Sequence, residues 1–316
     1  MARQADAERD AWTLLHNDYR HLHTSHYLTA GVSAAKRRPG IALLLWAIHA
    51  LVALVVALPV AGVFAELEAR GFGTAMARSV DITIMADLTP EVRSALRRLA
   101  LNLAWAIPLL ALVRAVTSAG VINATRDGGL RTFWSGVGRY GPKSIAVGIP
   151  YLALGIALQA ALIAIVVSVA SMFGEQGAVL TFLVVLPVGM AIIGATTDCM
   201  LDYSRMALII RDEPMLRSIG TGMGWPFRHP RAIPIYAFWM VVGAVLVLLP
   251  LFLDNAVTGG TVATVLVLTI AQQALLIVRS GVTVAWYGSE VAFFEEVADA
   301  EAPLIAGAEE LMSDDS

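Results

Sequence analysis

The order of apolar and polar residues divides the chain into six long hydrophobic runs separated by polar segments. A helix needs about 20 apolar residues to cross a hydrocarbon layer about 30 Å thick. Runs of this length cover residues 41–65, 99–121, 144–173, 177–200, 232–253 and 259–281. None shows the alternation of apolar and polar residues that marks a strand of a membrane β-barrel. The pattern therefore predicts an all-α polytopic membrane protein, a bundle of six transmembrane helices.

The spacing of the runs predicts that they pair as three antiparallel hairpins. Residues 174–176 join the third and fourth runs, and residues 254–258 join the fifth and sixth. Connections this short leave consecutive helices side by side. The first hairpin has a longer outer segment, in which we expect one or two short surface helices over residues 72–98.

Three regions follow from this pattern. Residues 1–40 form an amphipathic N-terminal segment, and residues 41–298 form the six-helix membrane domain. Residues 299–316 form an acidic tail, and we expect its last residues, from Glu309, to be disordered because they are polar and carry charges of one sign.

Composition supports lipid as the solvent for most of the chain. Of the 316 residues, 58% are hydrophobic and 15% are charged, whereas about 25% are charged in an average soluble domain. The net charge of −3 does not favour a polyanionic partner. A single cysteine, Cys199, excludes a disulfide framework. These values exclude an ordinary cytosolic enzyme, a disordered chain and a nucleic-acid-binding protein.

The distribution of lysine and arginine predicts the orientation of the spans. Basic residues gather in residues 1–40, 122–143 and 211–231, whereas the two short links contain none. Segments rich in lysine and arginine stay in the cytoplasm. The outer segment 66–98 runs against this rule, because it contains five arginines. We expect both termini in the cytoplasm.

Two cytoplasmic segments are similar in sequence and indicate an internal repeat. Residues 126–154 align with residues 211–240: both begin with Arg-Asp, contain Gly-x-Gly and place a proline before the next apolar run. Residues 30–39 form a weaker third copy. The predicted unit is a polar cytoplasmic helix, a Gly/Pro turn, a span, an outer link and a second span.

The polar segment ahead of each hairpin has apolar residues at helical spacing, which is typical of a helix lying on the membrane surface. In the third segment, glycines at 220, 222 and 224 weaken the prediction of a regular helix. Such helices either contact lipid or a partner, or brace the start of each hairpin. The aromatic residues that we expect at the interface are Trp12, Phe133, Trp134, Tyr140 and Trp225.

Ionisable residues in or directly after the second span of each hairpin form a candidate polar cluster. They are Arg114, Asp198, Asp202, Arg205 and Arg279. Asp198, Asp202 and Arg205 share one helix face through their spacing, and the two other arginines join them if the second spans are neighbours. Charges at this depth face a bundle interior or water. The cluster is either a set of ion pairs at the inner rim or a path for a solute or proton.

Catalytic chemistry leaves no recognisable trace in the sequence. The chain has no Walker loop and no HExxH, GxSxG or CxxC motif, so we expect neither an enzyme nor a bound cofactor. His16, His23 and His26 are weak metal candidates, but one helix carrying them does not supply a complete ligand set. We therefore expect no metal.

The aromatic and basic residues of the repeated segments resemble those of a group of bacterial six-span inner-membrane proteins. The resemblance is carried by Phe133-Trp134 with Arg139-Tyr140, and by Ile219, Trp225 and Arg228 in the later copy. The group includes the membrane domain found ahead of some glycerophosphodiester phosphodiesterase catalytic domains. The resemblance implies a six-span topology and a bacterial inner-membrane location, and it transfers no catalytic residue.

Three functions remain open at this point. The sequence favours a scaffold, assembly factor or regulatory subunit, in contact with lipid and with a protein partner or a second copy of itself. This function predicts close helix packing at glycines such as Gly155, Gly189, Gly194 and Gly243. A transporter or channel that uses the polar cluster is the alternative, and an enzyme that acts on lipid is the third.

Overall fold

The computed structural model describes residues 24–69, 104–170, 181–256 and 262–313, with a few isolated positions between these ranges. Every regular element in these ranges is a helix. Six of the helices are long and apolar enough to cross a membrane. The prediction of an all-α polytopic bundle with six spans is therefore confirmed.

Each expected span lies in a helix of its own. The helices are α2 (Thr24–Arg37), α3 (Pro39–Ala69), α7 (Ala106–Asp127), α8 (Leu130–Ala170), α10 (Leu186–Ile210), α11 (Met215–Arg228), α12 (Ala232–Ala256) and α13 (Val262–Ser313), with a π-helical turn, η2 (Thr181–Val185), directly before α10. The spans are α3, α7, α8, η2 with α10, α12 and α13. Most of the segment 72–98, where we expected short outer helices, lies outside the described residues.

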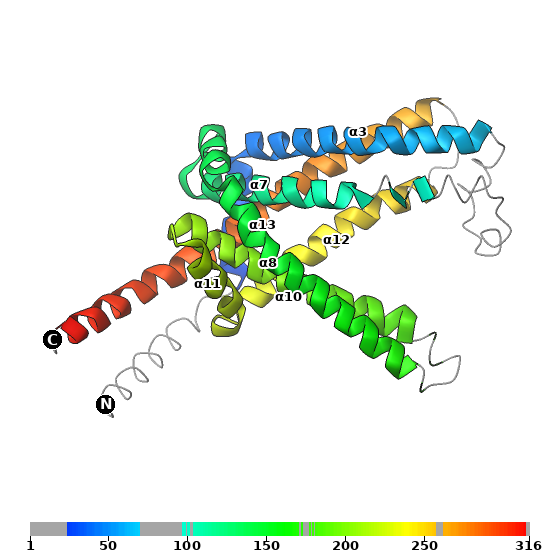
Figure 1. Cartoon of the computed structure of the whole chain (residues 1–316). Helices are drawn as coiled ribbons and strands as arrows, with labels where there is room; N and C mark the ends of the chain where they lie inside the picture. The colour runs from blue at the N-terminus through cyan, green and yellow to red at the C-terminus, as the bar shows by residue number, and fades with distance from the viewer. Residues whose placement is uncertain are drawn as a thin grey trace.

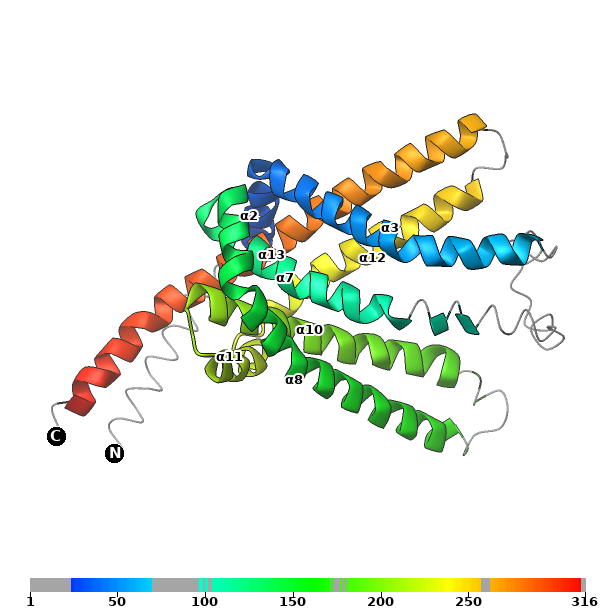
Figure 2. The same cartoon turned by 45° about the horizontal axis from the view of Figure 1, so that its top comes forward.

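Helical structure is more continuous than the sequence suggested. We expected a turn before the third span, yet α8 continues through Pro142 and Pro150 and changes direction along its length (Figure 2). Membrane helices tolerate proline because neighbouring groups satisfy the freed carbonyls. The glycines of α11 do not interrupt it. Residues 309–313 are helical as part of α13 rather than disordered.

The helices converge on one side of the molecule in a packed core, which we call the hub. Here α2 lies across the middle of α13, and the first part of α8 and α11 lie across the ends of α7 and α10 (Figure 1). The hub contains fully buried aromatic side chains, among them Tyr27, Phe133, Tyr203 and Phe294. The Trp225 ring lies 5.8 Å from the Tyr203 ring and 4.4 Å from the Phe294 ring. Burial of such large rings contributes much of the packing energy of a core.

A glycine in each crossing helix allows close contact with a span. Each glycine lies against two residues four apart: Gly31 of α2 against Ala285 and Ser289 of α13, Gly136 of α8 against Ala119 and Asn123 of α7, and Gly222 of α11 against Met200 and Ser204 of α10. A Cβ atom at any of the three would overlap atoms of the span. Small residues let helix backbones approach in this way. The contact between α2 and α13 brings the first described helix onto the last.

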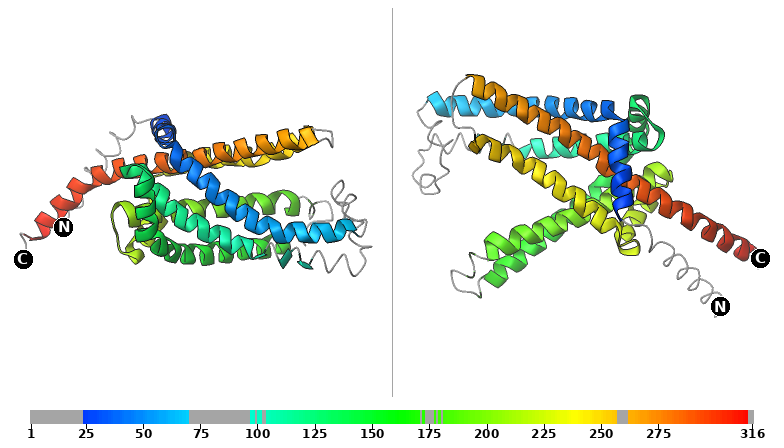
Figure 3. Two further views of the ribbon diagram at one scale, coloured as in Figure 1. Left: turned by 90° about the horizontal axis from the view of Figure 1, so that it is seen from above. Right: turned by 180° about the vertical axis from the view of Figure 1, so that it is seen from behind.

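The hairpins separate beyond the hub (Figures 1 and 3). α8 packs against α10, where Gly189 lies against Leu162 and Gly155 approaches Thr197. α12 pairs with α13, and α3 lies along α13 (Figure 3). A Cβ at Gly194 or Gly243 would meet no atom within 4 Å, so neither glycine is at a helix contact. In the most apolar windows of α8 and of η2 with α10, only 6% of residues are buried. These outer parts expose apolar side chains, as a lipid solvent requires.

Candidate functional site

The polar cluster lies where α7, α10, α12 and α13 enter the hub. Counting about 20 residues from Thr181 reaches Met200, so the span length places the hub-side edge of the hydrocarbon layer near this residue. Asp198 is just on the membrane side of this level, and Asp202 and Arg205 are just beyond it. Arg114 precedes Ala119, the residue under Gly136, by five positions or about 8 Å along the helix.

Arg114 and Asp198 form the more exposed half of the cluster. Arg114 Nη2 lies 2.5 Å from Asp198 Oδ2 and 3.7 Å from Asp202 Oδ2. The Tyr236 hydroxyl of α12 donates to Asp198 Oδ2 at 2.6 Å. The Tyr236 ring in turn packs edge-on against Trp286 of α13, with 4.9 Å between ring centres. One aspartate therefore links α7, α10 and α12.

Asp202 and Arg205 form the buried half. Arg205 Nη1 donates to Asp202 Oδ1 at 3.2 Å, and the two side chains are 3% and 1% exposed, respectively. The Tyr287 hydroxyl of α13 donates to the same oxygen at 3.2 Å. The helical spacing of the two charged residues makes this pair, and α13 adds the tyrosine.

Glu290 is a further buried acid that the sequence did not reveal as part of this region. Its side chain is completely buried. It lies close enough to Tyr203 and Cys199 of α10 to interact electrostatically with both side chains. Within the described residues, neither carboxyl oxygen has a hydrogen-bond partner, and neither has the Tyr203 hydroxyl. The sequence did contain one sign of a buried acid: Glu290 lies among apolar and aromatic residues at helical spacing, between Val284 and Val297.

Arg279 does not join the cluster. It is exposed on α13 and, in the described part of the chain, makes no ion pair with either aspartate. Its charge acts instead on His49 of α3. Nearby on α13, Gln273 accepts a hydrogen bond from the Trp46 indole at 3.1 Å, so these polar side chains link α3 to α13.

The expected interfacial aromatic residues have different roles. Phe133 is fully buried against Gly120, and Trp225 is buried in the hub. Tyr140 is also buried and donates to Asp212 Oδ1 at 3.3 Å. Trp134 is 54% exposed and suits contact with headgroups. Trp12 lies outside the described residues.

The histidine candidates form no metal site in the described part of the chain. His26 is exposed, with its ring 5.6 Å from that of Tyr27. His16 and His23 lie outside the described residues. Among the described residues, no group of three or more histidine, cysteine or acidic side chains is placed to hold a metal ion.

The cluster joins α7, α10, α12 and α13 through charged and polar contacts. Two arginines balance two aspartates, and tyrosine hydroxyls occupy further acceptor positions. Such charge-assisted contacts are strong and directional. Because they connect four helices, they fix how the hairpins enter the hub.

No protein-family model matches the chain, and comparisons with curated proteins and with solved structures find no similar protein.

Proposed function

We propose that this integral membrane protein is a non-enzymatic scaffold, assembly or regulatory subunit. The observation that carries the proposal is the contrast between a tightly packed hub and hairpins whose outer parts contact few other helices. The hub fixes the directions of the hairpins, and the hairpins present apolar faces to lipid or to helices of a partner.

The paired charges support this proposal. Asp202 and Arg205 are buried together and contact each other, and Tyr287 donates a further hydrogen bond to Asp202. A group already engaged with its neighbours is poorly suited to bind a passing solute, and better suited to hold helices in a fixed arrangement.

The exposed apolar residues support a partner or a second copy of the chain. Ile156 of α8 and Leu183 of η2 are 60% and 71% exposed. Membrane helices associate through close packing rather than by escaping water. A splayed hairpin with such faces has room for a further helix along its outer part.

The position of the charges supports a cytoplasmic hub. Arg37, Arg139, Arg211 and Arg228 all lie on the crossing helices or their connections, and positive residues favour the cytoplasmic side. We propose a bacterial inner-membrane location, as the resemblance noted in the sequence implies, with both termini inside, as the distribution of lysine and arginine indicates.

Photo-crosslinking in native membranes tests the proposal. A photoreactive amino acid at Ile156 or Leu183 is expected to give a protein adduct of one discrete mass, together with a native complex of fixed stoichiometry. Leu51 and Leu58 of α3, which are 64% and 65% exposed, provide the comparison face. If all four positions capture only lipid and the chain runs as a monomer, the scaffold proposal is wrong.

A transport path is the second candidate, and the exposure of the outer ion pair favours it. The Arg114 and Asp198 side chains are 49% and 23% exposed. A charged pair at the point where the hairpins diverge is costly beside lipid alone, and such residues often line water-filled routes.

Cysteine labelling distinguishes this route from a closed hub. With Cys199 replaced by serine, Thr197→Cys adds a thiol directly beside Asp198. A small charged thiol reagent added outside the cell is expected to modify it only if water reaches the cluster from that side. Met172→Cys, 83% exposed at the end of α8, is the positive control. Modification of Met172→Cys alone contradicts the transport route.

A further inference from the structure

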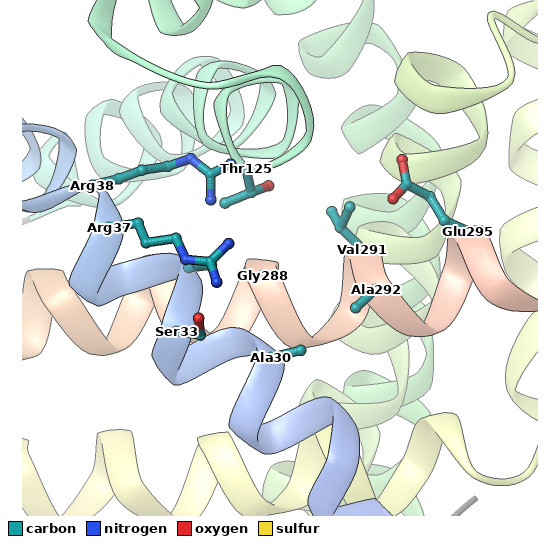
Figure 4. A pocket seen from close by; sticks show the side chains of 10 residues that line it. Ala30, Ser33, Arg37, Arg38, Thr125, Gly288, Val291, Ala292 and Glu295 are labelled. Atoms are coloured by element: carbon teal, nitrogen blue, oxygen red, sulfur yellow. The ribbon is translucent and has the colours of Figure 1, made fainter.

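The joint between α2, α7 and α13 contains a basic cavity. Its volume is about 340 Å³, and residues of all three helices line it. The side chains of Arg37 and Arg38 extend into it from the end of α2, Thr125 lies beside Arg38, and Glu295 faces them from α13 (Figure 4). The volume is at the lower end of the range of about 300–1,000 Å³ found for small-molecule sites.

Positive charge in the cavity exceeds negative charge. Its one acidic lining residue, Glu295, already pairs with Arg126 at 3.3 Å. In the described part of the chain, the guanidinium groups of Arg37 and Arg38 make no ion pair. Burial, with repulsion from Arg37 as a second cause, lowers the pKa of Arg38. Two adjacent cations therefore share the cavity without a carboxylate of their own.

Two positions of this joint carry small residues where the α11 joint carries large ones. The residue three positions after the glycine that contacts the span is Ala34 in α2 and Trp225 in α11. On the spans, the residue directly before the serine that this glycine contacts is Gly288 in α13 and Tyr203 in α10. In the α11 joint the two rings stack and fill the space, with the Arg211 guanidinium 5.4 Å from the Trp225 ring centre.

The corresponding joint of α8 carries an exposed ion pair at this position. Arg139 occupies the position of Ala34, and its Nη2 lies 2.8 Å from Asp212 Oδ2. Arg139 of α8 and Arg211, which precedes α11, therefore each have a partner within the protein. The α2 joint combines an open space with two arginines that form no ion pair among the described residues.

The position of the cavity relative to the membrane indicates the class of ligand. Arg37 and Arg38 come directly before α3, whose apolar run begins at Ile41, so the cavity lies beside the headgroup region. Basic pockets between membrane helices on the cytoplasmic side bind anionic headgroups, and arginine matches phosphate through paired donors. We infer that this cavity binds a phosphate group, carried by an anionic phospholipid or by a free phosphate. The inference does not depend on the scaffold proposal.

Ligand-dependent thermal stability of the purified full chain in nanodiscs of neutral phosphatidylcholine tests the inference. Added phosphatidylglycerol is expected to raise the melting temperature, because a ligand of the folded state stabilises it. The double variant R37Q/R38Q should bind about tenfold more weakly, since it loses charge-assisted hydrogen bonds. The matched control R131Q/R217Q removes two exposed arginines from α8 and α11 and should keep the wild-type affinity. Equal weakening in both double variants overturns the inference.

A cavity-filling variant covers the case in which R37Q/R38Q fails to fold. Ser33→Leu keeps both arginines and fills part of the space, so it should abolish the stabilisation; unchanged binding in this variant overturns the inference. Inorganic phosphate in the same neutral nanodiscs identifies the source. Stabilisation by phosphate that R37Q/R38Q removes supports a soluble ligand, and stabilisation by phosphatidylglycerol alone supports a lipid headgroup. If neither stabilises the wild type, the inference is wrong.

Discussion

At the scale of single residues, the hub depends on a buried pair of opposite charges. Removing two charges from water is costly, and their attraction repays this cost only when the geometry is good and further hydrogen bonds are made. Tyr287 adds such a hydrogen bond to Asp202 Oδ1, whereas Asp202 Oδ2 and Arg205 Nε are buried without one among the described residues. Loss of one partner leaves the other charge buried and uncompensated.

We predict that Asp202→Asn destabilises the protein by about 3–5 kcal/mol, the usual cost of breaking a buried ion pair. Arg139→Gln is the matched control, because the Arg139–Asp212 pair is 61% and 55% exposed and such a pair contributes about 0–1 kcal/mol. Unfolding of the purified protein by titrated denaturing detergent measures both. Equal losses of stability in the two variants would contradict the buried role of Asp202.

A second prediction concerns the contact between α11 and α10. Gly222→Ala places a Cβ against the Met200 carbonyl and Ser204, so it should cost about 1–3 kcal/mol through overpacking. Gly220→Ala on the same helix meets no atom within 4 Å and should gain up to about 1 kcal/mol from helix propensity. The same unfolding measurement compares them, and a neutral Gly222→Ala would show that the helices do not approach so closely.

The site residues that the sequence revealed are those whose relation is local. Asp202 and Arg205 are three positions apart, so helical geometry alone predicts that they meet. Tyr236, Tyr287 and Glu290 were not predicted, because their contacts depend on which helices pack beside α10. Arg279 shows the same limit: its position in a second span suggested the cluster, but its side chain is exposed near α3.

At the scale of elements, apolar run length was enough to predict every span, because lipid demands an unbroken helical stretch. Run length was not enough to predict where each helix begins and ends. Pro142 reads as a break in a soluble helix, and the acidic end of α13 reads as disordered, yet both are helical. The packing of α2 on α13 was also beyond sequence reasoning, since some 250 residues separate Gly31 from Ser289.

A disulfide tests the contact between these two helices. In a Cys199→Ser background, the double variant A34C/G288C should form an intramolecular disulfide on mild oxidation, because a Cβ at Gly288 would lie 2.8 Å from that of Ala34. A small shift then reaches the usual Cβ separation of about 3.5–4.5 Å. Protection of both thiols from a maleimide polymer, seen as the loss of a gel shift, reports the bond.

The control pair A34C/G281C keeps one cysteine and moves the other seven residues along α13, to a position with no neighbour within 4 Å. It should stay reduced under the same conditions. If both pairs oxidise at the same rate, the α2–α13 contact is not specific.

At the scale of the whole molecule, the described ends of α2 and α13 lie on the same side as the hub, opposite the tips of the hairpins (Figure 1). An even number of spans produces this arrangement. The basic residues of the crossing helices then lie together at one membrane surface, which is the distribution that fixes orientation during insertion.

Labelling of intact cells checks the orientation. In the same cysteine-free background, Leu216→Cys on α11 and Met172→Cys after α8 are 79% and 83% exposed. An impermeant maleimide should label Met172→Cys in intact cells and both variants after lysis. Labelling of Leu216→Cys in intact cells would reverse the proposed topology.

The packing of α2 on α13 also constrains the order in which the fold is assembled during synthesis. The ribosome makes α2 before α13, the helix that covers its glycine face, so a nascent chain carries an unmatched surface until α13 has been made. Assembly of the hub is consequently a late, post-insertion event, and a truncated product lacking α13 offers membrane proteases an incomplete fold to degrade.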